Sequence, residues 1–180
     1  MLTDLRLTYE DLCALPDNGK RYEIINGELF VTPSPRTAHQ KAVGNLYYYL
    51  SDFVKKSRVG EVFIAPFDVI LSDFDVVEPD LLYIAQTRSH VVTEKNVQGA
   101  PDLVIEVISP TTEGRDRSTK LKLYAQFGVK EYWIINPENL SAEVYCFEKG
   151  LGPVSVLHQE DVLTTQLLPG FSMLLHKLLE

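Results

Sequence analysis

Two apolar stretches decide the fold of this chain: VEPDLLYI, from Val77 to Ile84, and DLVIEVIS, from Asp102 to Ser109. Both have the length and the Val, Ile and Leu content of buried β-strands, and each carries a carboxylate in the run or at its start. A charge among aliphatic side chains is costly unless another group pairs with it. The stretches therefore predict a sheet, and they raise the question of what neutralises Asp80 and Glu106.

Helical and strand-like patterns surround these stretches. Helices are predicted at residues 7–16, 37–57 and 116–128, and a hairpin that turns at Asn26-Gly27 is predicted at 21–31. Strands are predicted at residues 61–71, 77–85, 102–109, 131–137, 142–150 and 153–160, with a closing helix or strand at 171–179. This order indicates an α/β (α+β) fold with a mixed or mostly antiparallel sheet flanked by helices.

The composition limits the class of protein. The chain has 180 residues, 45% of them hydrophobic, with no repeat or linker-like tract, so we expect one domain over residues 1–180. No apolar run approaches the roughly 20 residues that span a bilayer, and the first residues lack the pattern of a signal peptide. We expect a cytoplasmic protein in which Cys13 and Cys146 are free thiols; a disulfide between them is the alternative.

The net charge of -8 argues against a protein that coats nucleic acid, because phosphate contacts require Lys and Arg. It is compatible with an enzyme of nucleic acids, which needs only a local basic lining. Basic residues gather at 55–58 and at 115–130, where either group could meet phosphates, although solvated helix faces are the commoner explanation.

Strand geometry limits which carboxylates can meet. Asp102 and Glu106 share a face of their strand but lie about 13 Å apart, too far to bind one ion together. Asp80 lies on another strand; if that strand is the neighbour, the backbones are about 4.8 Å apart and the two carboxylates can converge. Two carboxylates with waters and phosphate oxygens suit Mg²⁺. Relief of their repulsion in Asp80→Asn is then expected to stabilise the metal-free fold slightly.

Each of these residues also has a purely structural interpretation. Asp80 and Asp102 each follow a proline and could mark the start of a strand. Glu106 has aliphatic residues on both sides, which indicates a central strand and leaves a buried salt bridge as the alternative to a site. Lys120, in the helix that follows, could reach that site or lie solvated at the surface.

A series of motifs in this order resembles a known family: YEIINGEL (22–29), EPDLLYI (78–84), GAPDLVIEVISPTT (99–112), DRSTKLKLY (116–124) and GVKEYWIINP (128–137). Over most of its length, from Tyr22 to Pro137, the chain resembles the "putative restriction endonuclease" family of the PD-(D/E)XK nuclease superfamily. The resemblance implies a restriction-endonuclease-like core, with an N-terminal helix and hairpin and C-terminal strands as additions.

The same resemblance implies three catalytic residues. The superfamily motif is Pro-Asp, a gap, Glu or Asp, one residue, then Lys. Asp80 and Glu106 match it, whereas Ile108 stands where the motif has Lys, and Lys120 in the following helix takes the place of a migrated lysine. By this analogy Asp80, Glu106 and the main-chain oxygen of Val107 would bind Mg²⁺ or Mn²⁺.

Two further residues match polar positions of the family and would line the site, namely Glu28 and His39. The alternatives are a hairpin-turn acid for Glu28 and a core histidine for His39, which lies four residues before Val43 on the apolar stripe of its helix.

The resemblance therefore implies a metal-dependent endonuclease that hydrolyses phosphodiester bonds in DNA, acting as a symmetric homodimer. Lys120 could position the attacking water, stabilise developing charge, or accept a proton if burial lowers its pKa. The alternative is a nuclease fold that binds nucleic acid or another partner without cleavage, which the net charge and the displaced lysine favour.

Overall fold

The computed structural model describes residues 6–16 and 18–180, and a six-stranded mixed sheet with the order β11-β10-β9-β8-β6-β3 lies at its centre. Strands β8 and β9 are parallel, and the other neighbouring pairs are antiparallel. Every residue of β8 is buried, as expected of a central strand. The strands of this sheet are β3 (Gly60–Ile64), β6 (Leu81–Ala85), β8 (Leu103–Val107), β9 (Glu131–Asn136), β10 (Ser141–Cys146) and β11 (Pro153–Leu157).

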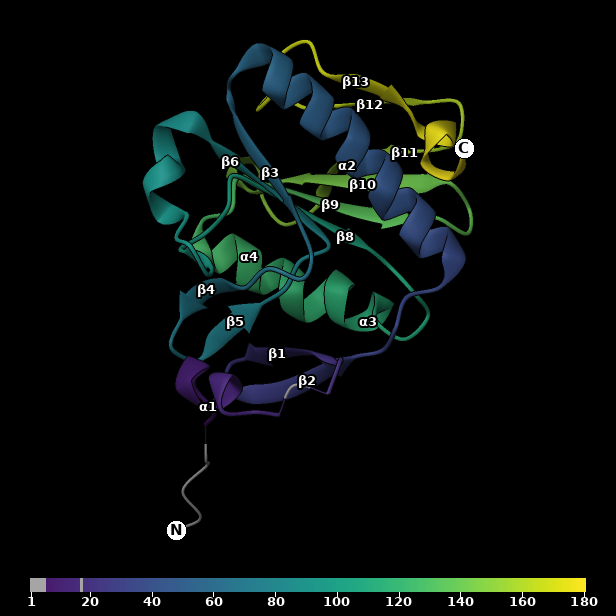
Figure 1. The fold of residues 1–180 in the computed structure, drawn as a ribbon. Helices are drawn as coiled ribbons and strands as arrows, with labels where there is room; N and C mark the ends of the chain where they lie inside the picture. Colours follow the sequence, from purple (N-terminus) through teal and green to yellow (C-terminus); the bar gives the residue numbers. More distant parts are fainter. Residues whose placement is uncertain (1–5, 17) are drawn as a thin grey trace.

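A second sheet, with the order β2-β1-β5-β4-β7, lies beyond α3 and α4 at the end of the molecule that carries α1 (Figure 1). Its hairpin turns at Asn26 and Gly27, which have φ angles of 55° and 83°, as the Asn-Gly pair predicts. The elements of this end are α1 (Tyr9–Cys13), β1 (Arg21–Ile25), β2 (Glu28–Thr32), β4 (Val69–Ser72), β5 (Asp75–Val77) and β7 (Val97–Gln98).

Helices cover both faces of the central sheet (Figure 1). Helix α2 (Thr37–Ser57) lies on one face, together with β12 (Val162–Thr164), β13 (Ser172–Leu174) and the 3₁₀ helix η4 (Leu175–Leu179). On the other face lies one continuous helical segment, made of α3 (Glu113–Arg115), the π-helical turn η2 (Asp116–Lys120) and α4 (Leu121–Phe127). The predicted α+β class and the flanking helices are confirmed.

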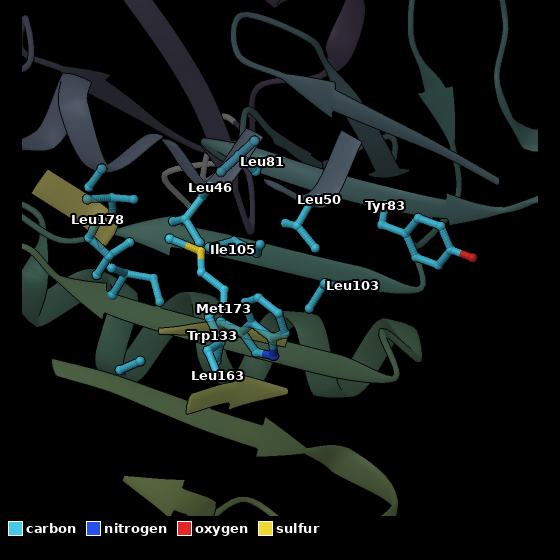
Figure 2. Close-up of a cluster of buried hydrophobic side chains, with 14 of the residues drawn as sticks. Leu46, Leu50, Leu81, Tyr83, Leu103, Ile105, Trp133, Leu163, Met173 and Leu178 are labelled. Atoms are coloured by element: carbon cyan, nitrogen blue, oxygen red, sulfur yellow. The ribbon is translucent and has the colours of Figure 1, made fainter. Parts of the chain in front are cut away.

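The alternation of side chains along the strands gives each face its own hydrophobic core. On the α2 face, Leu46 and Leu50 pack with Ile105 and Trp133 (Figure 2). On the other face, Val104 and Ile134 pack under α4. Glu106 shares the α4 face with Val104, so its carboxylate points into the second core rather than toward α2.

Two of the predicted strands are each divided in the structure, which corrects the sequence reading. The expected strand at 61–71 is β3 and β4, and the expected strand at 77–85 is β5 and β6, each pair contributing to different sheets. Both breaks contain a proline, Pro66 or Pro79, which has no N–H for a ladder hydrogen bond. The closing segment contains both alternatives, the strand β13 followed by η4.

Two smaller predictions concern thiols and membranes. Cys13 and Cys146 are free, so the disulfide alternative is wrong. In the described part of the chain, no helix combines the length and the apolar composition needed to cross a bilayer.

Candidate active site

The pairing of β6 with β8 brings the first two predicted site residues together. Leu81 lies opposite Ile105 in this antiparallel pair. One residue further, the same register sets Asp80 opposite Glu106, the neighbour relation on which the predicted convergence depended. Both residues line a cavity of about 20 Å³, which has room for about one water molecule or one ion.

Lys120 reaches the same cavity from the helical face. Its Nζ lies 2.7 Å from Oε1 of Glu106, and the hydroxyl of Tyr124 donates to the same oxygen at 2.8 Å. Lys120 is only 3% exposed, so the solvated-surface alternative is wrong for this lysine, whereas Lys122 is exposed. The three residues named from the sequence as catalytic therefore meet in one place.

Asp80 is fully paired within the cavity. Arg21 Nη1 lies 3.2 Å from Oδ1, while Oδ2 accepts the N–H of Val107 at 2.9 Å and lies 3.2 Å from Nε2 of His39. Burial would raise the pKa of Asp80, yet His39, Arg21 and the Val107 N–H together lower it. The folded chain thus favours the charged carboxylate, which argues against the expectation that Asp80→Asn stabilises the metal-free fold.

The sequence reading missed two acids of this site. Glu23 on β1 is 1% exposed, and its Oε1 lies 2.6 Å from Nζ of Lys120 and accepts the N–H of Glu78 at 3.0 Å. Asp116 is also buried, with Oδ1 3.9 Å from the same Nζ. A signal for Glu23 was present, because RYEII sets a carboxylate among apolar strand residues just as the run around Glu106 does.

Two cations of the site were also missed. Arg21 bridges Asp80 and Glu78, with Nε 2.9 Å from Oε2 of Glu78. Arg115 lies at the cavity wall, with Nη2 3.3 Å from Oε2 of Glu23. Arg21 stands in the predicted hairpin, whereas Arg115, in α3, lies one residue before the predicted helix at 116–128, and nothing in their spacing points to the cavity.

The two residues expected to line the site have different positions. His39 lies in α2, lines the cavity and contacts Asp80, so it is not a plain core histidine. Glu28 is an exposed residue at the start of β2 and is not among the residues of the cavity wall. The hairpin-turn interpretation describes Glu28, and Glu23 of the preceding strand stands in the site instead.

Asp102, on the same strand face as Glu106, forms a separate cluster at the other end of β8. It pairs with Lys130 at 2.7 Å and Arg88 at 3.1 Å, and it accepts the N–H of Ala85 at 2.9 Å. This arrangement agrees with its interpretation as a strand-entrance residue.

Electrostatics distinguish Glu106 from Lys120. Burial raises the pKa of Glu106 far above its ordinary value, and the neighbouring acids Asp116, Asp80 and Glu23 add to this effect against the attraction of Lys120. Burial alone would lower the pKa of Lys120, but Glu106, Glu23 and Asp116 outweigh it and raise that pKa. Lys120 is therefore held as an ammonium, which supports a role in charge stabilisation or positioning over a role as a base.

The cavity offers oxygen ligands of the kind that hard divalent cations prefer. Asp80, Glu106 and Val107 line it, and both hydrogen bonds that Glu106 accepts reach Oε1, which leaves Oε2 for another partner. Oδ1 of Asp116 is buried without a hydrogen bond. Within residues 6–16 and 18–180, no group of three or more His, Cys, Asp or Glu has metal-binding geometry. An ion here would take most ligands from water, backbone and substrate, as Mg²⁺ does.

A mixed sheet that brings a Pro-Asp, a Glu and a displaced Lys to one cavity defines the restriction-endonuclease-like class of proteins. The chain belongs to the Uma2 family, described as "Putative restriction endonuclease", whose sequence profile matches residues 8–176. A search of curated proteins found no match.

A solved structure has the same fold. It is the crystal structure of "a putative nuclease belonging to DUF820" from Anabaena variabilis ATCC 29413, which superposes with a TM-score of 0.79 at 18% sequence identity. The superposition covers 96% of this chain and 97% of that chain. The expected nuclease-like fold is therefore confirmed across nearly the whole length.

Proposed function

We propose that this chain is a Mg²⁺- or Mn²⁺-dependent endonuclease that hydrolyses phosphodiester bonds in DNA. The observation that carries the proposal is the convergence of Asp80, Glu106 and Lys120, from three separate elements, on one ion-sized cavity. Two acids and a fixed cation are the groups that phosphodiester hydrolysis needs, because the phosphate is anionic and repels its nucleophile.

Each side chain has a distinct task in this proposal. Asp80, Glu106 and the main-chain oxygen of Val107 would hold the divalent ion, which would neutralise the scissile phosphate and acidify a water molecule. Lys120 keeps its proton and stabilises negative charge that develops on the phosphate. His39 and Arg21 orient Asp80 through their contacts with its two oxygens.

The setting of the reaction is part of the same proposal. Residues 1–180 act as one domain in the cytoplasm, with DNA as the substrate, and two copies form a homodimer so that both strands can be cut. Family membership supports a nucleic-acid substrate. Gel filtration with light scattering tests the dimer separately from the chemistry.

The test is a cleavage assay on plasmid and oligonucleotide DNA with Mg²⁺, with Mn²⁺ and with chelator. Wild-type protein is expected to nick or cut DNA only with metal, and Glu106→Gln to leave it intact. Lys122→Ala, an exposed lysine next but one to Lys120, is the matched control that retains activity. Equal cleavage by wild type and Glu106→Gln would trace the activity to a contaminant.

One observation favours a second candidate, a nuclease fold that binds nucleic acid without cutting it. Both carboxylate oxygens of Asp80 already have partners in Arg21, His39 and Val107 N–H, so an ion must share Asp80 with them. DNA binding without cleavage under any metal condition would support this candidate.

A further inference from the structure

We infer that Glu23, Asp116 and Glu106 form a second cation site whose resident is the ammonium of Lys120, so that this nuclease centre takes one divalent ion and not two. The inference rests on the proposed function in that it concerns the same cavity. It adds roles for Glu23 and Asp116, and it states the metal stoichiometry.

The ammonium is held as a small cation would be. Oε1 of Glu23 lies 2.6 Å from Nζ of Lys120, and Oε1 of Glu106 lies 2.7 Å from it. Oδ1 of Asp116 lies 3.9 Å from the same atom. The three carboxylates come from β1, β8 and η2, so segments distant in the sequence converge on one positive charge. All three acids are at most 4% exposed, so solvent screens their interaction with the ammonium only weakly.

Unsatisfied oxygens indicate that these acids can accept more positive charge. Oδ1 of Asp116 and Oε2 of Glu23 are both buried without a hydrogen bond. Oε2 of Glu23 has only an ion-pair contact, 3.3 Å from Arg115 Nη2. Buried carboxylate oxygens usually have partners, so Oδ1 of Asp116, 3.9 Å from Nζ of Lys120, marks a ligand oxygen that the ammonium does not use.

The geometry separates this site from that of the divalent ion. Glu106 is shared, because its Oε1 accepts from Lys120 and Tyr124 while Oε2 is left for an ion beside Asp80. The ammonium of Lys120 already occupies the position between Glu23 and Glu106, so a second divalent ion could not bind there without strong repulsion from it. Metal–oxygen distances of about 2.0–2.6 Å are close to the 2.6 and 2.7 Å that separate Nζ from Glu23 and Glu106, so small shifts would let these two oxygens bind an ion once the lysine is removed. Asp116, at 3.9 Å, would have to move further to join them.

The experiment counts bound Mn²⁺ by electron paramagnetic resonance and by calorimetry. Wild-type protein is expected to bind one Mn²⁺ per chain at saturation, and Lys120→Ala to bind two, with spin coupling between them. Lys122→Ala, the exposed neighbour on the same helical segment, is expected to remain at one. Adding Glu23→Gln to Lys120→Ala is expected to return the count to one.

The outcomes separate this inference from the proposed function. Two ions on wild-type protein, or one on Lys120→Ala, would overturn the inference and leave the nuclease proposal standing. One ion on wild type and two on Lys120→Ala, with no DNA cleavage by wild type under any metal condition, would support the inference and overturn the proposed function. The wild-type count needs no substitution, so a value above one decides against the inference even if Lys120→Ala does not fold.

Discussion

The two ends of β8 each bury a carboxylate on the same strand face, but they surround it differently. At the start, Asp102 faces two cations, Lys130 and Arg88, and one backbone N–H. At the end, Glu106 lies among three other acids, and Lys120 is the cation that contacts it. The acids of this second cluster are Glu23, Asp80, Glu106 and Asp116.

The pKa shifts express this difference. Burial would raise the pKa of Asp102, but Ala85 N–H, Lys130 and Arg88 hold it below its ordinary value. Burial raises the pKa of both Glu106 and Asp116; the attraction of Lys120 does not compensate for it, even with Thr112 and Arg115 also acting on Asp116. A buried acid with matched partners indicates a structural role, whereas an excess of buried acid indicates a site that receives a cation from outside.

The rate of DNA cleavage should distinguish the two ends of β8 most strongly. Asp80→Asn is expected to lower the rate of Mg²⁺-dependent DNA cleavage by at least about 100-fold, because it removes a metal-binding carboxylate. The cleavage rate of Asp102→Asn is expected to stay within about threefold of the wild-type rate, because about 13 Å of strand separates Asp102 from Glu106. Initial rates on plasmid DNA at saturating Mg²⁺ measure both. A comparable loss in Asp102→Asn would mean that the two ends are not independent.

Stability in chelator should show the reverse order. Asp102→Ala leaves the Ala85 N–H and two cations without their acceptor, so we expect a loss of about 2 kcal/mol in the free energy of unfolding. Lys130 and Arg88 are partly exposed and can turn to water, which limits the loss. Glu106→Gln is expected to change stability by less than about 1 kcal/mol near neutral pH, because burial keeps Glu106 largely protonated without metal and a neutral amide then replaces a neutral carboxyl.

Urea unfolding monitored by the fluorescence of Trp133 gives both free energies. A larger loss of unfolding free energy in Glu106→Gln than in Asp102→Ala would contradict this prediction. It would show that Glu106, at the end of β8, is better matched by its partners than Asp102.

The sequence allowed the strands and helices that carry both ends to be predicted, because apolar periodicity reports local burial. Glu106 was identified for the same reason: a lone carboxylate in an aliphatic strand requires a partner. The pairing of β6 with β8 could only be assumed from the sequence, because strand order depends on contacts between residues distant in the chain. The breaks at Pro66 and Pro79 were misread because the runs on either side of each proline are equally apolar.

The partners of the site could not be predicted for a related reason. Arg21 lines the cavity, and Glu23 contacts Lys120 and Arg115, only because the second sheet packs beside α3 and η2. Local spacing carries no information about that packing. The family motif misdirected attention within the hairpin from Glu23 to Glu28. Lys120 was identified through the resemblance, and its place in η2 is a feature of the three-dimensional structure alone.

The dependence of stability on pH is a finer test of the same contrast. Between pH 5 and 8 the folded chain holds a proton on Glu106, whose pKa is raised to about 8, that the unfolded chain has released. The wild-type free energy of unfolding should therefore fall as pH rises, with at most about 1.4 kcal/mol per pH unit from this group. Asp102 has a lowered pKa, so its contribution is lost only below about pH 4, outside this range.

Thermal unfolding in chelator from pH 5 to 8 measures the slope. Glu106→Gln should flatten it and Asp102→Asn should leave it unchanged. A slope that Glu106→Gln does not alter would assign the proton to another acid, with Asp116 the first candidate because its pKa is raised as well.

The smallest expected effect concerns the two acids of the hairpin. Glu28→Gln should change the free energy of unfolding and the activation free energy of cleavage each by less than about 0.5 kcal/mol, because Glu28 is exposed and lies outside the cavity. Glu23→Gln should lower the cleavage rate measurably, because it removes one of the two carboxylates within 2.7 Å of Lys120 Nζ. Parallel initial rates of the two variants, with melting temperatures to exclude unfolding, compare them directly. A loss of cleavage in Glu28→Gln and not in Glu23→Gln would support the family-based assignment of Glu28 to the site. It would also show that Glu23 has no role in cleavage.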